Sequence, residues 1–119
     1  MNAELNAKTA EVMGWELSND GECWLGVAGE IIINISNWNP SENFDHALKC
    51  VEKFTDLGAA FELGKAPFSL WRASLIVTVV PKKVTSVMFG ENPAEAICLA
   101  VIEADKKLKD EEIDDYRKI

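Results

Sequence analysis

The stretch Ser69-Leu70-Trp71-Arg72-Ala73-Ser74-Leu75-Ile76-Val77-Thr78-Val79-Val80 decides the fold class of this chain. Its side chains alternate between two faces. Trp71, Ala73, Leu75, Val77 and Val79 share one face, and Arg72, Ser74, Ile76, Thr78 and Val80 share the other. A period of two in a run rich in β-branched residues predicts a strand with one face against a core. Pro81-Lys82-Lys83 then predicts a turn, and Val84 to Phe89 is expected to return as the antiparallel partner.

Helices are predicted on both sides of this hairpin in the sequence. After it, Asn92-Pro93-Ala94-Glu95 places a capping Asn, a first-turn Pro and a Glu in the order that starts a helix. Its apolar stripe runs to Leu108 and is wider than one face, which predicts a well-buried helix or one that packs on two sides. Before the hairpin, helices are expected over residues 44–57, capped by Ser41 or Asn43, and over residues 3–13.

Short strands complete the predicted element order. We expect two at residues 22–27 and 30–35, where the isoleucines favour a partly buried sheet, and a third at 59–63. The order is then α-β-β-α-β-β-β-α, an α+β fold in which a mostly antiparallel sheet carries packed helices. No repeat or linker divides the chain, so residues 1–109 are expected to form a single domain, with an acidic C-terminal tail at 110–119. The pattern does not assign the helices to one face of the sheet or to both.

Composition narrows the classes of partner. The chain has 119 residues, 48% of them hydrophobic, which is enough for one core. Its net charge of -8 argues against direct binding of nucleic acid or of an anionic membrane, because both require basic patches. A basic protein surface would still be attracted, although the charge could also serve only solubility. The longest apolar run is far too short to cross a membrane.

Catalytic and metal-binding patterns are scarce. Cys23, Cys50 and Cys98 form no CxxC pair, which favours reduced thiols over a zinc site or a disulfide framework. His46 and Cys50 are four residues apart, so they could share a helix face as metal ligands or as a thiolate–imidazole pair. The alternative is a small core cysteine beside a surface histidine. Glu62 is expected on the outward side of a short strand. We therefore expect no catalytic residue, no metal, no cofactor and no enzymatic activity.

Tryptophans and charged side chains supply the candidate contact residues. Trp38 lies in a polar loop between Asn37 and Asn39, which makes it the first candidate, because tryptophan is enriched at binding hot spots. Its alternative role is to cover the edge of the core. Trp71 and Arg72 are further candidates, with Arg72 suited to an anion or to a surface ion pair. The tail residues Asp110, Glu111, Glu112, Asp114 and Asp115 could dock on a basic groove or remain solvated.

Three stretches together resemble a known family. They are Asn6-Ala7-Lys8-Thr9-Ala10-Glu11-Val12-Met13-Gly14-Trp15, Asn43-Phe44-Asp45-His46-Ala47-Leu48-Lys49-Cys50-Val51-Glu52-Lys53-Phe54 and Asn92-Pro93-Ala94-Glu95-Ala96-Ile97-Cys98-Leu99-Ala100. In their order and spacing they resemble the phage ABA sandwich domain proteins and the related NinX-like small phage proteins. The resemblance implies an α/β/α sandwich and a temperate-phage or prophage origin, and it carries no catalytic residues. The acidic tail departs from the family pattern.

These observations lead to one main functional hypothesis. We expect a phage accessory protein that binds a host or bacterial-defence protein in the host cytoplasm, for example as an anti-CRISPR-like counter-defence inhibitor. A second hypothesis is an oligomer that sequesters a small nucleotide signal, using tryptophans with Arg72 or the hairpin lysines, and pairing through the last helix. A structural interaction domain and an enzyme with an unrecognised site are the remaining alternatives.

Overall fold

The computed structural model describes residues 2–79 and 82–110. The elements in chain order are helix α1 (Ala3–Val12), strands β1 (Glu16–Leu17), β2 (Cys23–Leu25) and β3 (Ile31–Asn34), the 3-10 turn η1 (Ile35–Asn37), helix α2 (Phe44–Thr55), strand β4 (Ala60–Lys65), the 3-10 turn η2 (Pro67–Ser69), strands β5 (Trp71–Val79) and β6 (Lys82–Gly90), and helix α3 (Pro93–Asp110). This is an α+β fold, as the sequence predicts. The expected order lacks only β1, a strand of two residues, which is too short to produce a recognisable alternation.

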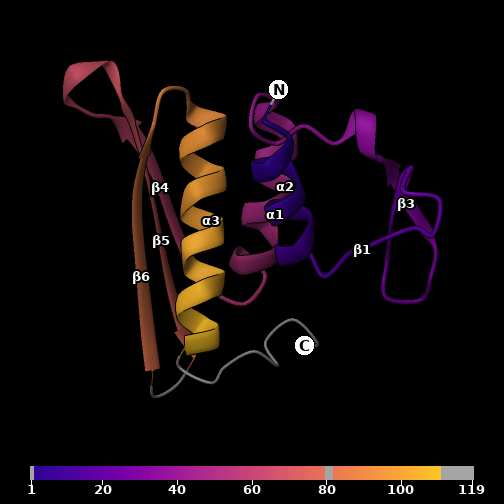
Figure 1. Ribbon diagram of the computed structural model, residues 1–119. Helices are drawn as coiled ribbons and strands as arrows, with labels where there is room; N and C mark the ends of the chain where they lie inside the picture. The colour runs from indigo at the N-terminus through magenta and orange to yellow at the C-terminus, as the bar shows by residue number, and fades with distance from the viewer. Residues whose placement is uncertain (1, 80–81, 111–119) are drawn as a thin grey trace.

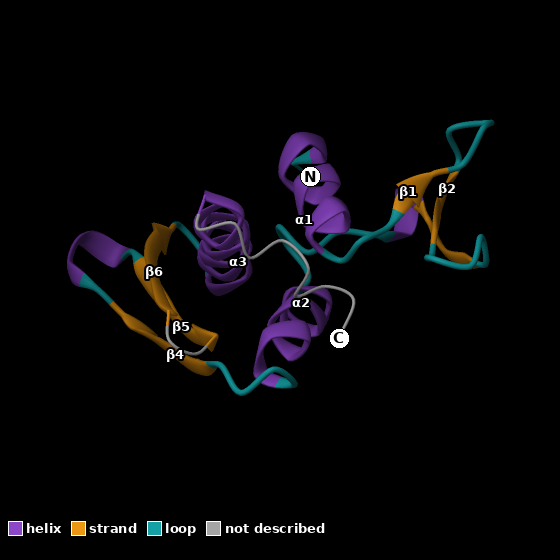
Figure 2. Ribbon diagram, turned by 90° about the horizontal axis from the view of Figure 1, so that it is seen from below, coloured by secondary structure: helices purple, strands orange, loops and turns teal. Residues whose placement is uncertain are grey.

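The antiparallel strands form two sheets rather than one. The first sheet has the order β1-β2-β3, and the second has the order β4-β5-β6. In Figures 1 and 2 the helices lie between the two sheets, and all of them lie on the same side of the second sheet. β3 and β4, which flank α2 in the sequence, therefore belong to different sheets.

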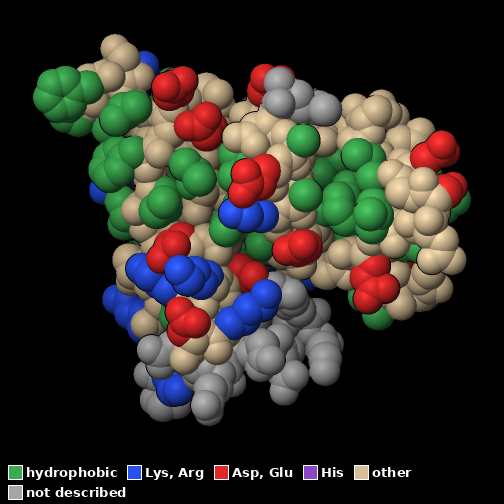
Figure 3. All heavy atoms as spheres, viewed as in Figure 1, with side chains coloured by type: hydrophobic (Ala, Val, Ile, Leu, Met, Phe, Trp, Pro, Cys, Tyr) green, Lys and Arg blue, Asp and Glu red, His purple; other side chains and the backbone are tan. Residues whose placement is uncertain are grey.

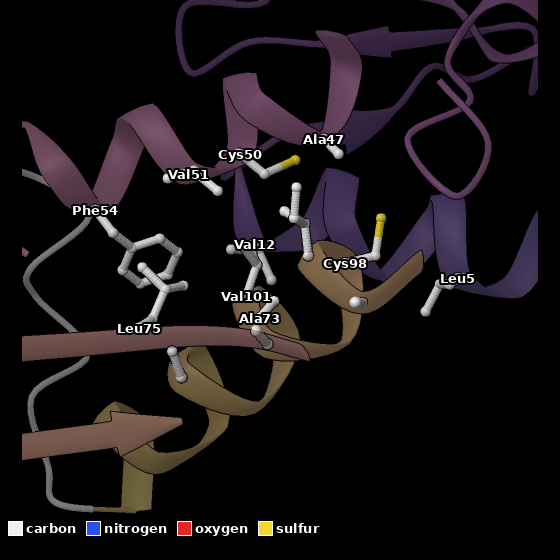
Figure 4. Packing of buried hydrophobic residues seen from close by; sticks show 14 of the residues in the cluster. Leu5, Val12, Ala47, Cys50, Val51, Phe54, Ala73, Leu75, Cys98 and Val101 are labelled. Atoms are coloured by element: carbon white, nitrogen blue, oxygen red, sulfur yellow. The ribbon is translucent and has the colours of Figure 1, made fainter. Parts of the chain in front are cut away.

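The second sheet confirms the predicted two-faced strand. Ala73, Leu75 and Val77 of β5 are fully buried, whereas Arg72 and Thr78 on the opposite face are exposed. Figure 4 shows how Leu75 approaches Phe54 of α2 on the buried side. The hairpin partner is longer than predicted, because β6 begins at Lys82, so Lys82 and Lys83 belong to a strand and not to the turn.

Helix α3 lies close to the second sheet because its contact face is built from small residues. Ala96, Ala100 and Ala104 are fully buried, and the Ser86 hydroxyl of β6 donates a hydrogen bond of 2.8 Å to the carbonyl oxygen of Ala100. Gly90 ends β6 directly beneath the first turn of the helix. A Cβ atom at this position would lie 2.5 Å from the backbone nitrogen of Ala96, so only glycine permits this approach.

Asparagines cap the helices, as the sequence signals indicate. The Oδ1 atom of Asn2 accepts from the Leu5 amide, and that of Asn92 accepts from the Glu95 amide. At α2 the structure decides between the two predicted caps, since Asn43 accepts from the His46 amide. Each cap satisfies an amide that would otherwise lack a partner in the first turn.

The isoleucines of the first sheet are more exposed than the sequence suggests. Ile31 is 71% exposed and Ile32 is 42% exposed, and only Ile33 among the three packs against the core. Trp24 is the buried side chain of the described strands of this sheet, and Leu17 is also exposed. The isoleucines at 31–33 are therefore not all buried, and Ile31 and Ile32 form part of an exposed apolar surface.

Candidate functional site

An apolar pocket lies between α1 and the first sheet. Its volume is about 210 Å³, and seven residues from the two sides line it: Ala3, Asn6, Ala7, Leu17, Trp24, Ile35 and Trp38. Figure 3 shows apolar side chains gathered over this region. We call this recess the apolar pocket.

Trp38 is part of the wall of the pocket and not a contact residue on an exposed loop. Its side chain is 1% exposed, and its indole Nε1 donates to the carbonyl oxygen of Asn6 at 3.1 Å and to Thr9 Oγ1 at 3.3 Å. The ring meets Trp15 edge-on at 4.8 Å and stacks on His46 at 5.1 Å between centroids. The structure thus shows the alternative role predicted for Trp38, which covers the edge of the core because the polar loop that carries it folds back onto α1.

A buried polar network holds that loop in place. Asn6, which is 5% exposed, accepts from the Ser41 amide at 3.0 Å and donates through Nδ2 to Asn39 Oδ1 at 3.1 Å. The Asn39 amide in turn donates to Nδ1 of His46 at 3.1 Å. Asn6 is not among the contact residues that the sequence predicts. Its signal is an asparagine, a poor helix former, in a helix interior beside the apolar stripe, where it must find a partner when buried.

The lining suits an apolar group. The side chain of Asn6 is occupied by the network, and the other lining residues present carbon surface and aromatic rings. An apolar cavity of roughly 150 Å³ is enough to bind benzene, so this pocket has room for a phenyl or isobutyl group. An apolar recess of this kind is where an anchor side chain contributes most to binding.

The first sheet, which forms one side of the pocket, carries negative charge only. Glu16, Asp20, Glu22 and Glu30 are the charged residues of the segment 16–34, and the segment has no lysine or arginine. All four are exposed. Exposed apolar residues accompany them, with Leu17 at 52%, Ile31 at 71% and Val27 at 96%. The first sheet therefore combines apolar surface with uncompensated negative charge.

The remaining candidate residues do not join this pocket. Trp71 and Arg72 lie on β5 of the second sheet, and the helices separate them from the pocket. Because the two residues are adjacent on one strand, their side chains point to opposite faces of the sheet. The Lys65 ammonium sits over the Trp71 ring at 4.8 Å. The Arg72 guanidinium lies 4.0 Å from the carboxylate of Glu62, which is exposed on the outer face as expected.

The loop and tail candidates have separate positions. Asn37 is exposed at the end of η1, whereas Asn39 is half-buried and its side chain also donates to Glu42. Asp110 is the last residue of α3 and is exposed. The other tail candidates, Glu111, Glu112, Asp114 and Asp115, lie outside the described residues.

His46 and Cys50 do not form a thiolate–imidazole pair. The Cys50 thiol faces the backbone carbonyl of His46 at 3.6 Å, and the imidazole Nδ1 accepts from Asn39. Burial raises the pKa of Cys50 to about 12, and burial also raises the pKa of Cys98, so both thiols stay protonated near neutral pH. Burial lowers the pKa of His46, and the charge of Lys49 adds to this effect. Residues 2–79 and 82–110 contain no group of three or more His, Cys, Asp or Glu side chains arranged to hold a metal.

The wide apolar surface of α3 is used inside the chain. Ile97, Val101 and Leu108 are fully buried, and Leu99 and Ile102, which widen the stripe, pack against the same core. The helix contacts β5 and β6 on one side and α1 and α2 on the other. The exposed apolar surface that motivated a homo-oligomer through this helix is therefore taken up by intramolecular packing.

Fold and pocket define a small α+β domain with an apolar recess between its first helix and its minor sheet. The sequence model of the phage ABA sandwich domain matches residues 9–102, and the chain belongs to this family. The match begins within α1 and ends within α3, and the resemblance to the NinX-like proteins is not confirmed by it. Comparisons with curated proteins and with solved structures gave no match. Within the described ranges, no helix has the length and apolar content needed to cross a bilayer.

Proposed function

We propose that this phage protein is a non-enzymatic accessory protein that binds and modulates a host or bacterial-defence protein in the host cytoplasm. The observation that carries the proposal is the apolar pocket beside a sheet with exposed apolar side chains and no positive charge. Large apolar side chains held in water contribute nothing to folding. Their clustering around a recess is typical of a surface that another protein covers.

The chemistry of the surface specifies the kind of partner. The pocket accepts an apolar anchor side chain, and the carboxylates of Glu16, Asp20, Glu22 and Glu30 favour basic residues around that anchor. Complementary charge raises the association rate and disfavours wrong partners more than it raises affinity. We therefore infer a partner segment with one buried aromatic or aliphatic residue flanked by lysine or arginine.

Two rival functions fit the geometry less well. A nucleotide signal needs cations around its phosphates, and the described residues that line the pocket include no lysine or arginine, while Arg72 lies on the far sheet. An enzyme built on His46 and Cys50 would need their side chains in contact. The imidazole is instead engaged by Asn39 and the thiol by a backbone carbonyl.

The test is affinity capture from host lysate with a set of matched baits. Ala7→Trp fills the pocket from α1, and Glu16→Lys combined with Glu22→Lys reverses charge on the first sheet. Phe89→Ser removes an exposed aromatic residue on the outer face of the second sheet and serves as the control. We expect a partner that binds the wild-type chain and the control, that is lost with the pocket-filled bait, and that weakens several-fold with the charge-reversed bait at low salt.

Two outcomes would contradict the proposal. One is a lysate that yields no partner for the wild-type bait at low salt. The other is a partner that binds the pocket-filled bait as well as the wild type, provided that circular dichroism shows both baits folded.

A further inference from the structure

The connection between β4 and β5 presents a phenylalanine to solvent in a strained backbone. Phe68, at the centre of residues 66–70, is 95% exposed. Phe68 has φ 65° and Ser69 has φ 63°, so two consecutive residues other than glycine lie in the left-handed region. The Ala66 amide donates to the Leu70 carbonyl oxygen at 2.9 Å and closes the loop below them. We call residues 66–70 the tip loop, and Figure 1 shows it projecting beyond the second sheet.

Neither feature of the tip loop contributes to the stability of the isolated chain. Left-handed backbone at a residue with a Cβ atom is unfavourable, and an exposed phenyl ring gains nothing from burial. Burial of the ring in an apolar site on another molecule is favourable and offsets the cost of the left-handed backbone. The tip loop therefore has the properties of an anchor that is already held in its binding conformation.

The apolar pocket matches this anchor in size, polarity and charge. About 210 Å³ of apolar space accommodates a phenyl ring. The segment 64–72 around the tip carries Lys65 and Arg72, and Arg72 already lies 4.0 Å from the exposed carboxylate of Glu62 on β4. The segment 16–34 of the first sheet carries four carboxylates and no cation, so the two segments have opposite charge.

The ring cannot reach the pocket of its own chain. The tip loop extends from the second sheet and the pocket adjoins the first sheet, with the helices between them in both views (Figures 1 and 2). An occupant with this anchor must therefore come from a second copy.

We propose that Phe68 of one copy inserts into the apolar pocket of a second copy, with Lys65 and Arg72 beside the carboxylates of its first sheet. This contact joins two different surfaces, so it leaves a free tip loop at one end and a free pocket at the other. Copies then join head to tail into a closed ring or an open chain. The inference goes beyond the proposed function, and it implies that a host partner and a second copy compete for one pocket.

The first experiment is sedimentation equilibrium of the purified protein from about 10 µM to about 1 mM at roughly 0.15 M salt. At this ionic strength the repulsion between distant charges is screened beyond about 8 Å, while contacting charges still interact. We expect the average mass to rise with concentration. Phe68→Ser should lower the association constant by about 10- to 100-fold, the value of burying one phenyl side chain. Val87→Ser, at an exposed apolar residue of β6 opposite Ser74, should leave the constant unchanged.

A mixing experiment tests the pairing of anchor and pocket directly. Phe68→Ser keeps the pocket and lacks the anchor, and Ala7→Trp keeps the anchor and fills the pocket. Each variant alone should remain monomeric, and an equimolar mixture should form a dimer that grows no further. Circular dichroism confirms that each variant is folded, and Phe68 at 95% exposure can be replaced without loss of core contacts.

The inference is overturned if the wild-type chain stays monomeric at the highest concentration, or if Phe68→Ser associates as the wild type does. Its failure is distinguishable from failure of the proposed function. A monomeric protein whose host partner is lost with Ala7→Trp refutes self-association and leaves the proposed function standing. Association that depends on Phe68, in a protein that captures no host partner, supports self-association and refutes the proposed function.

Discussion

Replacing Trp38 with alanine tests whether the loop after the first sheet is part of the core. The side chain is 1% exposed and packs against Trp15 and His46, so its removal opens a cavity beside the apolar pocket. Truncation of a buried tryptophan costs about 3–5 kcal/mol. The Asn6 carbonyl keeps a hydrogen bond from Thr9 Oγ1 at 2.7 Å, so no additional penalty for an unpaired buried acceptor arises there.

The melting temperature converts this cost into a measurable shift. An unfolding entropy of about 2.1 cal/mol/K per residue over 119 residues gives roughly 0.25 kcal/mol/K. Trp38→Ala should then lower the melting temperature by about 12–20 °C. Trp38→Phe keeps a ring in the stack and loses the Nε1 donor and some area, so a loss of about 1–2 kcal/mol and a shift of about 4–8 °C are expected.

Differential scanning calorimetry measures both shifts. The reasoning is refuted if Trp38→Ala melts within about 2 °C of the wild type, because an exposed contact residue changes stability by no more than about 0.5 kcal/mol. It is also refuted if the two variants melt at the same temperature, since the ring stack would then contribute nothing.

Gly90→Ala should destabilise the protein by about 1–3 kcal/mol in urea unfolding, because its Cβ meets the backbone of α3, whereas Gly64→Ala, with open space at its Cβ, should cost far less. The lowered pKa of His46 means that the native state binds fewer protons than the unfolded state. Stability should therefore be greatest above neutral pH and fall as pH drops below about 6.5, and His46→Gln should flatten that part of a melting-temperature profile. In the native protein a thiol reagent should label Cys23 before the two buried thiols, with all three labelled after denaturation.

Local sequence signals predicted the second sheet and the helices because their causes are local. The alternation around Leu75 and Val77 repeats with the pleat of a strand, and both residues are fully buried. The asparagine before each helix accepts from an amide of the first turn, and that geometry spans only three residues.

The candidate site was less predictable. Trp38 is a candidate contact residue because its neighbours in the sequence are polar. In the structure, hydrogen bonds from these same polar neighbours hold Trp38 in a buried position. Asn39 and Ser41 bond to Asn6, and the Trp38 indole bonds to the carbonyl of Asn6, 32 positions away in the sequence. The sequence of a polar loop suggests exposure, and its burial becomes evident only when the hydrogen-bond partners of its side chains are known.

Local sequence patterns are sufficient to place the helices, their caps, most of the strands and the buried face of β5, because each depends on the period of the backbone or on groups a few residues apart. Tertiary contacts, in contrast, divide the strands into two sheets, put the helices on one side of the second sheet and form a pocket against α1. These features depend on which distant segments meet, and on apolar surface such as Ile31 and Phe68 that the core has no room to bury.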